Sequence, residues 1–244
     1  MNYIGIDIGS TCAKTVVLNE KKEIIQEFVQ PTGWSSVDTA EEIHQKLQLA
    51  GINLSDDSSC CVATGYGRIS VPYADKTVTE ITCHALGAVH LFQQPDLTVI
   101  DIGGQDTKII QIEQGFVKDF IMNDKCAAGT GRFLEVMANT LSLRPNEMFD
   151  LARLGSDTTI SSMCTVFAES EVIGLIGKGE PKENIAYAVV NSTIRKVAAQ
   201  VSRMNGELST FCLTGGLCEC EYIREALSKE PVSYTHLRAH ETDS

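Results

Sequence analysis

Asp7-Ile8-Gly9-Ser10-Thr11-Cys12-Ala13-Lys14, near the start of the chain, returns in its middle as Asp101-Ile102-Gly103-Gly104-Gln105-Asp106-Thr107-Lys108. Aspartate, isoleucine, glycine and lysine occupy the same four positions in both stretches. Apolar and small residues alternate just before each stretch, over residues 3–8 and 97–102, which is typical of a strand that ends in a turn. The copies lie too far apart for a solenoid repeat, so the sequence predicts two similar lobes.

Further strands and helices follow each copy in a similar order. Strands are predicted at residues 13–18, 23–29 and 60–63 in the first half, and at 108–112, 115–121 and 210–214 in the second. The spacing of apolar residues predicts helices near 37–50, 80–92, 130–141, 146–154, 165–178 and 182–204, with a last helix ending near 229. Strands followed by helices, twice, predict an α/β fold with helices packed on two sheets. We expect one lobe over residues 1–95 and another over residues 96–230, facing each other across a cleft.

Composition and charge restrict the classes of function. The 244 residues carry a net charge of −12, so we expect no nucleic-acid partner, because phosphate backbones would be repelled. The N-terminus lacks a signal-peptide pattern and no apolar run of about 18 residues is present, so we expect a cytoplasmic protein outside the membrane. In a reducing cytoplasm the nine cysteines are not expected to form disulfides. The Cys218-x-Cys220 pair lacks the second ligand pair that zinc sites usually have.

The repeated stretch has the chemistry of a phosphate-binding loop. Asp7 and Asp101 end their strands, where a carboxylate can hold Mg²⁺ directly or through water. Gly9 and Gly103 let the backbone turn tightly and approach a ligand. Amides and hydroxyls that can surround phosphate oxygens follow at Ser10, Thr11, Gly104 and Gln105, and Lys14 can offset triphosphate charge.

An ordinary hairpin turn is the alternative interpretation, since such turns also use aspartate and glycine. One copy alone would favour it. Two copies with a shared lysine position, together with a third glycine signal at Gly215-Gly216, favour a nucleotide.

This constellation resembles the superfamily of acetate and sugar kinases, heat-shock chaperones and actin. The resemblance implies two ribonuclease H-like lobes around a cleft that binds ATP with Mg²⁺. It also implies that Asp7 and Asp101 with their loops hold different phosphate groups, and that Gly215-Gly216 packs against adenosine. Gln105 and Asp106 lie on the second loop and are both candidates for positioning the hydrolytic water.

Two cysteines stand in similar settings, each in a segment that precedes a predicted helix. Cys126 lies in Asn123-Asp124-Lys125-Cys126-Ala127-Ala128-Gly129-Thr130-Gly131-Arg132-Phe133, and Cys164 lies in Ser161-Ser162-Met163-Cys164-Thr165-Val166-Phe167. The amides at a helix start favour a thiolate. An iron–sulfur cluster commonly takes four cysteines, and a two-fold dimer would supply four from two per chain. Two unrelated buried cysteines remain the alternative.

These cysteine segments, with Thr64-Gly65-Tyr66-Gly67-Arg68, resemble the family of 2-hydroxyacyl-CoA dehydratase activators, which includes the ATPase subunits of benzoyl-CoA reductase. The similarity extends over nearly all of residues 1–230. It implies a homodimer with one [4Fe-4S] cluster between the subunits, held by Cys126 and Cys164 of each chain. It further implies that ATP hydrolysis drives one electron into an acyl-CoA dehydratase or reductase, with a ferredoxin or flavodoxin as electron donor.

Residues 231–244 do not fit this pattern, because they lack apolar periodicity. We interpret them as a foreign or misread end and leave them out of the fold prediction. Two rival functions remain open for the rest of the chain. One is a small-molecule kinase of the same superfamily, which would transfer phosphate to a hydroxyl or carboxyl group. The other is a nucleotide-dependent regulatory module without a redox centre.

Overall fold

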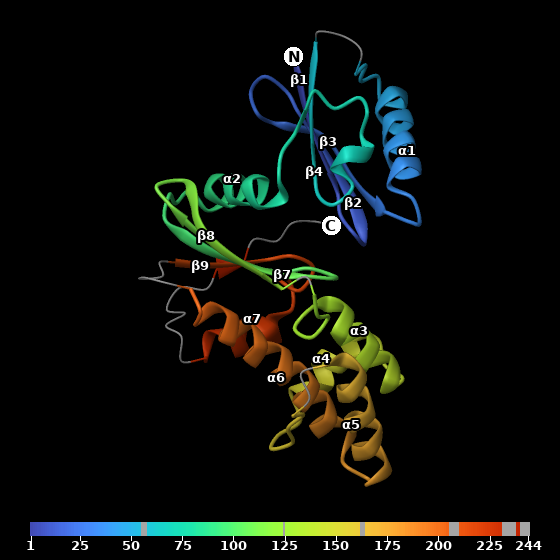
Figure 1. Ribbon diagram of the computed structural model, residues 1–244, viewed down its shortest axis with the longest axis vertical. Coiled ribbons are helices and arrows are strands. Elements are labelled where there is room, and N and C mark those ends of the chain that lie inside the picture. The colour runs from blue at the N-terminus through green and yellow to red at the C-terminus, as the bar shows by residue number, and fades with distance from the viewer. Residues whose placement is uncertain (55–57, 124, 162–163, 205–209, 231–237, 240–244) are drawn as a thin grey trace. The chain divides into compact units, whose positions relative to one another are not determined.

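The computed structural model describes residues 1–54, 58–123, 125–161, 164–204, 210–230 and 238–239. The chain forms two compact units, Met1–His84 and a second unit from Ala85 onward, each with its own sheet and its own core (Figure 1). The division falls inside helix α2 (Glu80–Phe92), earlier in the chain than residue 95, where the sequence suggested a boundary.

The first unit is a five-stranded sheet with helix α1 packed on it. Its elements are β1 (Asn2–Ile8), β2 (Cys12–Leu18), β3 (Ile24–Pro31), α1 (Ser36–Leu49), β4 (Ser59–Thr64), a 3₁₀ turn η1 (Arg68–Ser70) and β5 (Lys76–Thr77). The strand order is β3-β2-β1-β4-β5. Alternation along β1 buries Ile4, Ile6 and Ile8, and the helical spacing of Ile43 and Leu47 brings both onto the same core.

The second unit repeats this sheet and adds more helices. Its elements are β6 (Leu97–Ile102), β7 (Thr107–Glu113), β8 (Phe116–Asn123), α3 (Gly131–Thr140), α4 (Pro145–Ala152), α5 (Thr165–Gly177), α6 (Lys182–Val201), β9 (Thr210–Thr214), α7 (Glu221–Ser228) and β10 (Arg238–Ala239). The strand order is β10-β9-β6-β7-β8. Helices α3 to α7 gather on one side of this sheet (Figure 1). Strands β6 and β7 are almost entirely buried. Their buried residues include polar and charged side chains beside the apolar ones, namely Thr98, Asp101, Thr107, Lys108 and Gln111.

The two sheets share strand order, direction and one irregularity. In each, three antiparallel strands are followed by a fourth strand parallel to the first and a fifth parallel to the fourth. The pairing register shifts between Val17 and Leu18 in β2 and between Gln111 and Ile112 in β7, at the same point of the repeat. The predicted duplicated α/β fold, ribonuclease H-like in each unit, is therefore confirmed.

The C-terminal segment is described only in part. Residues 231–237 and 240–244 lie outside the described residues, and Arg238–Ala239 pair with Cys212–Leu213 at the edge of the second sheet. The foreign origin of this segment stays a prediction. Among the helices of the described ranges, none has the length and apolar character needed to cross a membrane.

Candidate phosphate loops and cysteine segments

The first repeated stretch is a tight turn between β1 and β2. The Gly9 amide donates to the Cys12 carbonyl at 3.2 Å, which closes the turn and leaves Ser10 and Thr11 exposed. Lys14 stands opposite Asp7 on the neighbouring strand, and its Nζ lies 3.2 Å from Asp7 Oδ2. The Asp7 side chain is 35% exposed and the Lys14 side chain 45%, so water and a ligand can reach both.

The second stretch makes the same turn in a more buried setting. The Gly103 amide donates to the Asp106 carbonyl at 2.9 Å, and Gly104 and Gln105 are exposed. Lys108 stands opposite Asp101, yet its Nζ lies closest to Asp106 Oδ1, at 2.6 Å, with Asp101 Oδ2 at 3.7 Å. These three charged side chains are each at most 10% exposed. Two buried carboxylates thus share one buried ammonium.

The shared spacing of aspartate and lysine has a structural cause. In both hairpins the two residues face each other across neighbouring strands, so the recurring lysine is first of all the ion-pair partner of its aspartate. The position of Asp106 is taken by Cys12 in the first turn, so only the second turn has the additional carboxylate. Because Asp106 is buried against Lys108, the exposed Gln105 is the better placed of the two candidates for contact with water.

A glycine after the fourth strand of each sheet lies against the aspartate strand. Thr64 pairs with Asp7 and Thr214 pairs with Asp101, and each threonine precedes a glycine with positive φ, +84° at Gly65 and +83° at Gly215. A Cβ atom at either glycine would lie 2.5 Å from a backbone carbonyl of the first strand, that of Ile8 or Ile102. Thr64-Gly65 is therefore the counterpart of Thr214-Gly215, a correspondence that the sequence analysis missed because the flanking residues differ.

The two aspartates differ in their other contacts. Thr214 Oγ1 donates to Asp101 Oδ1 at 3.2 Å. The equivalent Thr64 Oγ1 is buried and has no hydrogen-bond partner among the described residues. Asp101 is thus held by a neighbouring strand and lies close to Lys108, whereas Asp7 is more open to a ligand.

The segment that contains Cys126 lies directly beside the second phosphate loop. The first two amides of α3, those of Gly131 and Arg132, donate to the carbonyls of Gly103 and Gly104 at 2.9 and 2.8 Å. We expected the amides of this helix start to favour a thiolate at Cys126. Instead, these two amides are used by the phosphate loop, and half-buried Cys126 lies in the turn ahead of them.

Cys164 has the setting that the sequence predicted. It is the residue before the first turn of α5, it is exposed, and its carbonyl accepts from the Ala168 amide at 2.8 Å. Its neighbours Ser162 and Met163 lie outside the described residues. Cys164 is therefore accessible to a second protein chain or to a bound group.

The other cysteine pair belongs to the core. Cys218 is 3% exposed, and Cys218 and Cys220 both pack with the apolar residues of the second unit. Burial raises the pKa of both thiols, so they stay protonated at neutral pH, unlike metal ligands. Within the described ranges, no group of three or more His, Cys, Asp or Glu side chains is placed to hold a metal ion.

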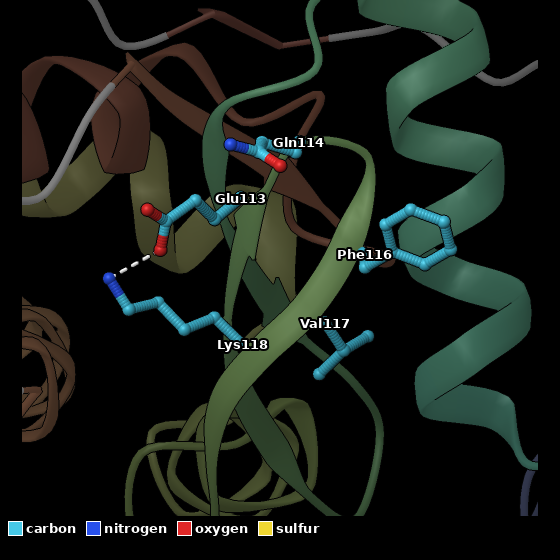
Figure 2. A pocket seen from close by; sticks show the side chains of 5 residues that line it. All are labelled: Glu113, Gln114, Phe116, Val117 and Lys118. Carbon is cyan, nitrogen blue, oxygen red and sulfur yellow. Dashed lines mark ion pairs between the residues drawn. The ribbon is translucent and has the colours of Figure 1, made fainter.

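A separate hollow of about 350 Å³ lies at the turn between β7 and β8 and contains none of the predicted site residues. Figure 2 shows its lining: an ion pair of Lys118 with Glu113, and the side chains of Gln114, Phe116 and Val117. It is open to solvent and offers no second charged pair, so we assign the candidate chemistry to the phosphate loops and the cysteine segments.

Known proteins resemble this chain over nearly its whole length. Residues 4–240 match the model of the BadF/BadG/BcrA/BcrD ATPase family. The (R)-2-hydroxyglutaryl-CoA dehydratase activating ATPase of Acidaminococcus fermentans is 42% identical over 231 residues, which are 93% of this chain and 86% of that protein.

Two solved structures have the same fold. Component A of the (R)-2-hydroxyglutaryl-CoA dehydratase of Acidaminococcus fermentans superposes with a TM-score of 0.86 at 38% identity, covering 98% of this chain and 92% of that one. The activator of the 2-hydroxyisocaproyl-CoA dehydratase from Clostridium difficile, solved with bound ADPNP, gives a TM-score of 0.83 at 33% identity, covering 99% and 89%. Both likenesses include both units of this chain.

Proposed function

The chain belongs to the BadF/BadG/BcrA/BcrD ATPase family, and we propose that it hydrolyses ATP to drive single electrons from a [4Fe-4S] cluster into an acyl-CoA dehydratase or a related reductase. One combination of features supports this proposal most. The chain has two exposed candidate phosphate loops with the same backbone turn, and a cysteine segment that ATP hydrolysis does not require lies beside the second loop.

For ATP we propose roles that follow from exposure and charge. The amides and hydroxyls of Ser10 and Thr11 bind phosphate oxygens, as do the amides of the exposed Gly104 and Gln105. The Gly103 amide is used within the turn, so Gly103 contributes through the tight backbone that brings this loop to the phosphates. Lys14 and Gly9 belong to the first phosphate loop, and Gly215 and Gly216 contact the adenosine. Asp7 holds Mg²⁺ with its accessible carboxylate, and Asp101 supports the metal from its more buried place. The Gln105 side chain orients the attacking water.

For the cluster we propose Cys126 and Cys164 of each of two copies as ligands. The fit is favourable in two respects. Cys164 is exposed at a helix start, where backbone amides stabilise a thiolate. Cys126 is followed only by small residues, Ala127 to Gly131, which leave room beside its sulfur. Two copies supply the usual four thiolates. When bound, the cluster supplies one electron at a time, and a ferredoxin or flavodoxin would replace that electron.

The test is an anaerobic activation assay with the dehydratases that similar proteins activate, those for 2-hydroxyglutaryl-CoA and 2-hydroxyisocaproyl-CoA. We expect dehydration to require this chain, a reductant and ATP, and to stop when ADPNP replaces ATP. The D7N variant should lose at least about 100-fold in ATP hydrolysis, because a charged ligand of the metal is removed. Phosphate transfer to a sugar or an acid, with no activation of either dehydratase, would contradict the proposal and favour a kinase.

A further inference from the structure

The turn that contains Cys126 is held from the sheet side by three hydrogen bonds. Thr107 Oγ1 donates to the Gly129 carbonyl at 2.6 Å, and both residues are buried. The Asn123 side-chain amide donates to the carbonyls of Cys126 and Ala128 at 2.9 and 3.0 Å. The backbone from Cys126 to Gly129 is therefore fixed to strands β7 and β8, and it cannot shift without disturbing these bonds.

The same turn is held from the other side by the second phosphate loop. The cysteine turn leads directly into Gly131 and Arg132. The Gly131 amide donates to the Gly103 carbonyl, and the Arg132 amide donates to the Gly104 carbonyl. A Cβ atom at Gly131 would lie 3.3 Å from the Gly103 carbonyl oxygen, closer than such contacts usually are, so the absence of a side chain allows this approach. Phosphate loop and cysteine turn are thus joined by backbone hydrogen bonds.

The first unit fastens its phosphate loop differently. There the Thr32 side chain donates to the Gly9 carbonyl at 2.7 Å, and the Thr32 amide donates to the Thr11 carbonyl at 3.0 Å. The segment that follows leads into α1 and contains no cysteine. In the second unit, by contrast, the segment that contacts the loop contains Cys126.

A buried hydrogen bond resists breaking, because no water is present to replace the lost partner. When the loop at Gly103–Gln105 adjusts to a nucleotide, its carbonyls move the amides of Gly131 and Arg132, and the buried bond from Thr107 keeps the turn aligned with the start of β7. We infer that Thr107 and Gly131 are positioning residues that couple the second phosphate loop to Cys126, so that nucleotide binding changes the accessibility of this cysteine. This inference rests on the proposed ATP binding and adds to it the route of coupling.

The coupling can be read from the thiol itself, without iron. Metal-free, reduced protein is labelled with N-ethylmaleimide with and without ADPNP, and the tryptic peptide of residues 126–132, released by cleavage after Lys125 and Arg132, reports on Cys126 alone. Binding of ADPNP is measured in parallel by calorimetry. We expect ADPNP to change the labelling rate of the wild type by about fivefold or more, the lower end of ordinary coupling between sites.

Two substitutions should remove the response. T107V deletes the donor, and G131A places a methyl group against the Gly103 carbonyl, so in both the change with ADPNP should fall below about twofold. T107S keeps the hydroxyl and should restore the response. T98V is the matched control: Thr98 is also a fully buried threonine of this sheet, and its Oγ1 has no hydrogen-bond partner among the described residues, so the wild-type response should persist.

The outcomes separate the coupling from the proposed function. A wild type that binds ADPNP, with T107V or G131A retaining the full response, overturns the coupling and leaves ATP binding in place. If T107V does not fold, the labelling response of G131A alone tests the coupling. A wild type that shows no ADPNP binding overturns the proposed function, and the coupling with it.

Discussion

Lys14 and Lys108 show how one position of a repeat can take on two tasks. Both face the aspartate near the end of the first strand of their sheet. In the first unit the pair is exposed, and in the second it is buried together with Asp106. An exposed pair contributes little to stability, because water screens it, whereas a buried charge that loses its partner is costly. We therefore propose that Lys108 mainly stabilises the fold and that Lys14 mainly contacts the nucleotide.

The two lysines are a matched pair for mutation. K108M leaves the buried carboxylates of Asp101 and Asp106 without their ammonium, and should lower the free energy of unfolding by about 3–5 kcal/mol. K14M should cost less than about 1 kcal/mol, and should weaken ATP binding instead. Urea unfolding of the nucleotide-free variants measures both. A K108M protein with the midpoint of the wild type would show that its charge is not needed.

Thiol reactivity should separate the cysteines by setting. Burial raises the pKa of Cys218 and of Cys220, so at pH 8 less of each thiol is ionised, and the fraction grows only as the pH rises toward the raised pKa. Exposed Cys164 should be alkylated at least about tenfold faster than Cys218, because the reagent reaches its sulfur without local unfolding of the core. Peptide-resolved labelling of the metal-free protein measures the rates. Comparable rates at Cys164 and Cys218 would contradict the burial of Cys218.

At the scale of elements, the decisive feature is the end of the fourth strand in each sheet. Gly65 and Gly215 let β4 and β9 turn away against the carbonyls of Ile8 and Ile102, which leaves the aspartate carboxylates at the strand ends. Both backbones have positive φ, which an L-residue adopts at a cost of about 1–2 kcal/mol. The close approach of each glycine to a carbonyl of the first strand is a second, steric reason for glycine. Two independent constraints therefore select glycine at each of these positions.

Substitution by alanine should separate the cost of the positive φ from the cost of the steric overlap. G65A and G215A add an overlap with backbone, which costs about 1–3 kcal/mol beyond the cost of positive φ. G51A is the control, because Gly51 has a φ of +78° and no atom within 4 Å of an added Cβ. Chemical unfolding should show the first two variants to be less stable than G51A. Equal losses in all three would mean that the strand ends can relax away from the methyl group.

Much of this architecture could be predicted from the sequence. Apolar alternation located β1 to β4 and β6 to β9, and helical spacing located α1 to α7, because long periodic segments carry a strong signal. The two-residue strands β5 and β10 and the short turn η1 were not predicted, since so few residues show no periodicity. The shared lysine was visible, but its place opposite the aspartate depends on strand register.

The sequence was sufficient to name the residues of the candidate site, but it did not reveal their contacts. The sequence showed the exposed loop residues and both cysteine segments. It could not show that the first amides of α3 bind the carbonyls of Gly103 and Gly104, because that contact joins segments separated by strands β7 and β8. Nor could it show the burial of Asp106, which follows from how Lys108 packs.

At the scale of the whole molecule, the chain is a duplication whose halves have diverged. Both units keep the sheet and the turn with aspartate, glycine and lysine. Within the part of the chain that the structure describes, the second unit has four helices, α3 to α6, between its third and fourth strands, where the first unit has α1 alone. The two candidate cluster cysteines lie ahead of α3 and α5, in this added part. This division is consistent with the proposal that the duplicated sheets bind ATP and that the added helices take part in electron transfer.

Native mass spectrometry of the anaerobically purified protein, combined with iron analysis, tests the central claim most directly. We predict a dimer that contains about four iron atoms and four sulfides, as one [4Fe-4S] cluster requires. C126S and C164S should each lose the iron and its visible absorbance, whereas C218S should keep both, because Cys218 is a core residue. An iron-free wild type, or a C126S or C164S dimer with its full iron content, would contradict the account.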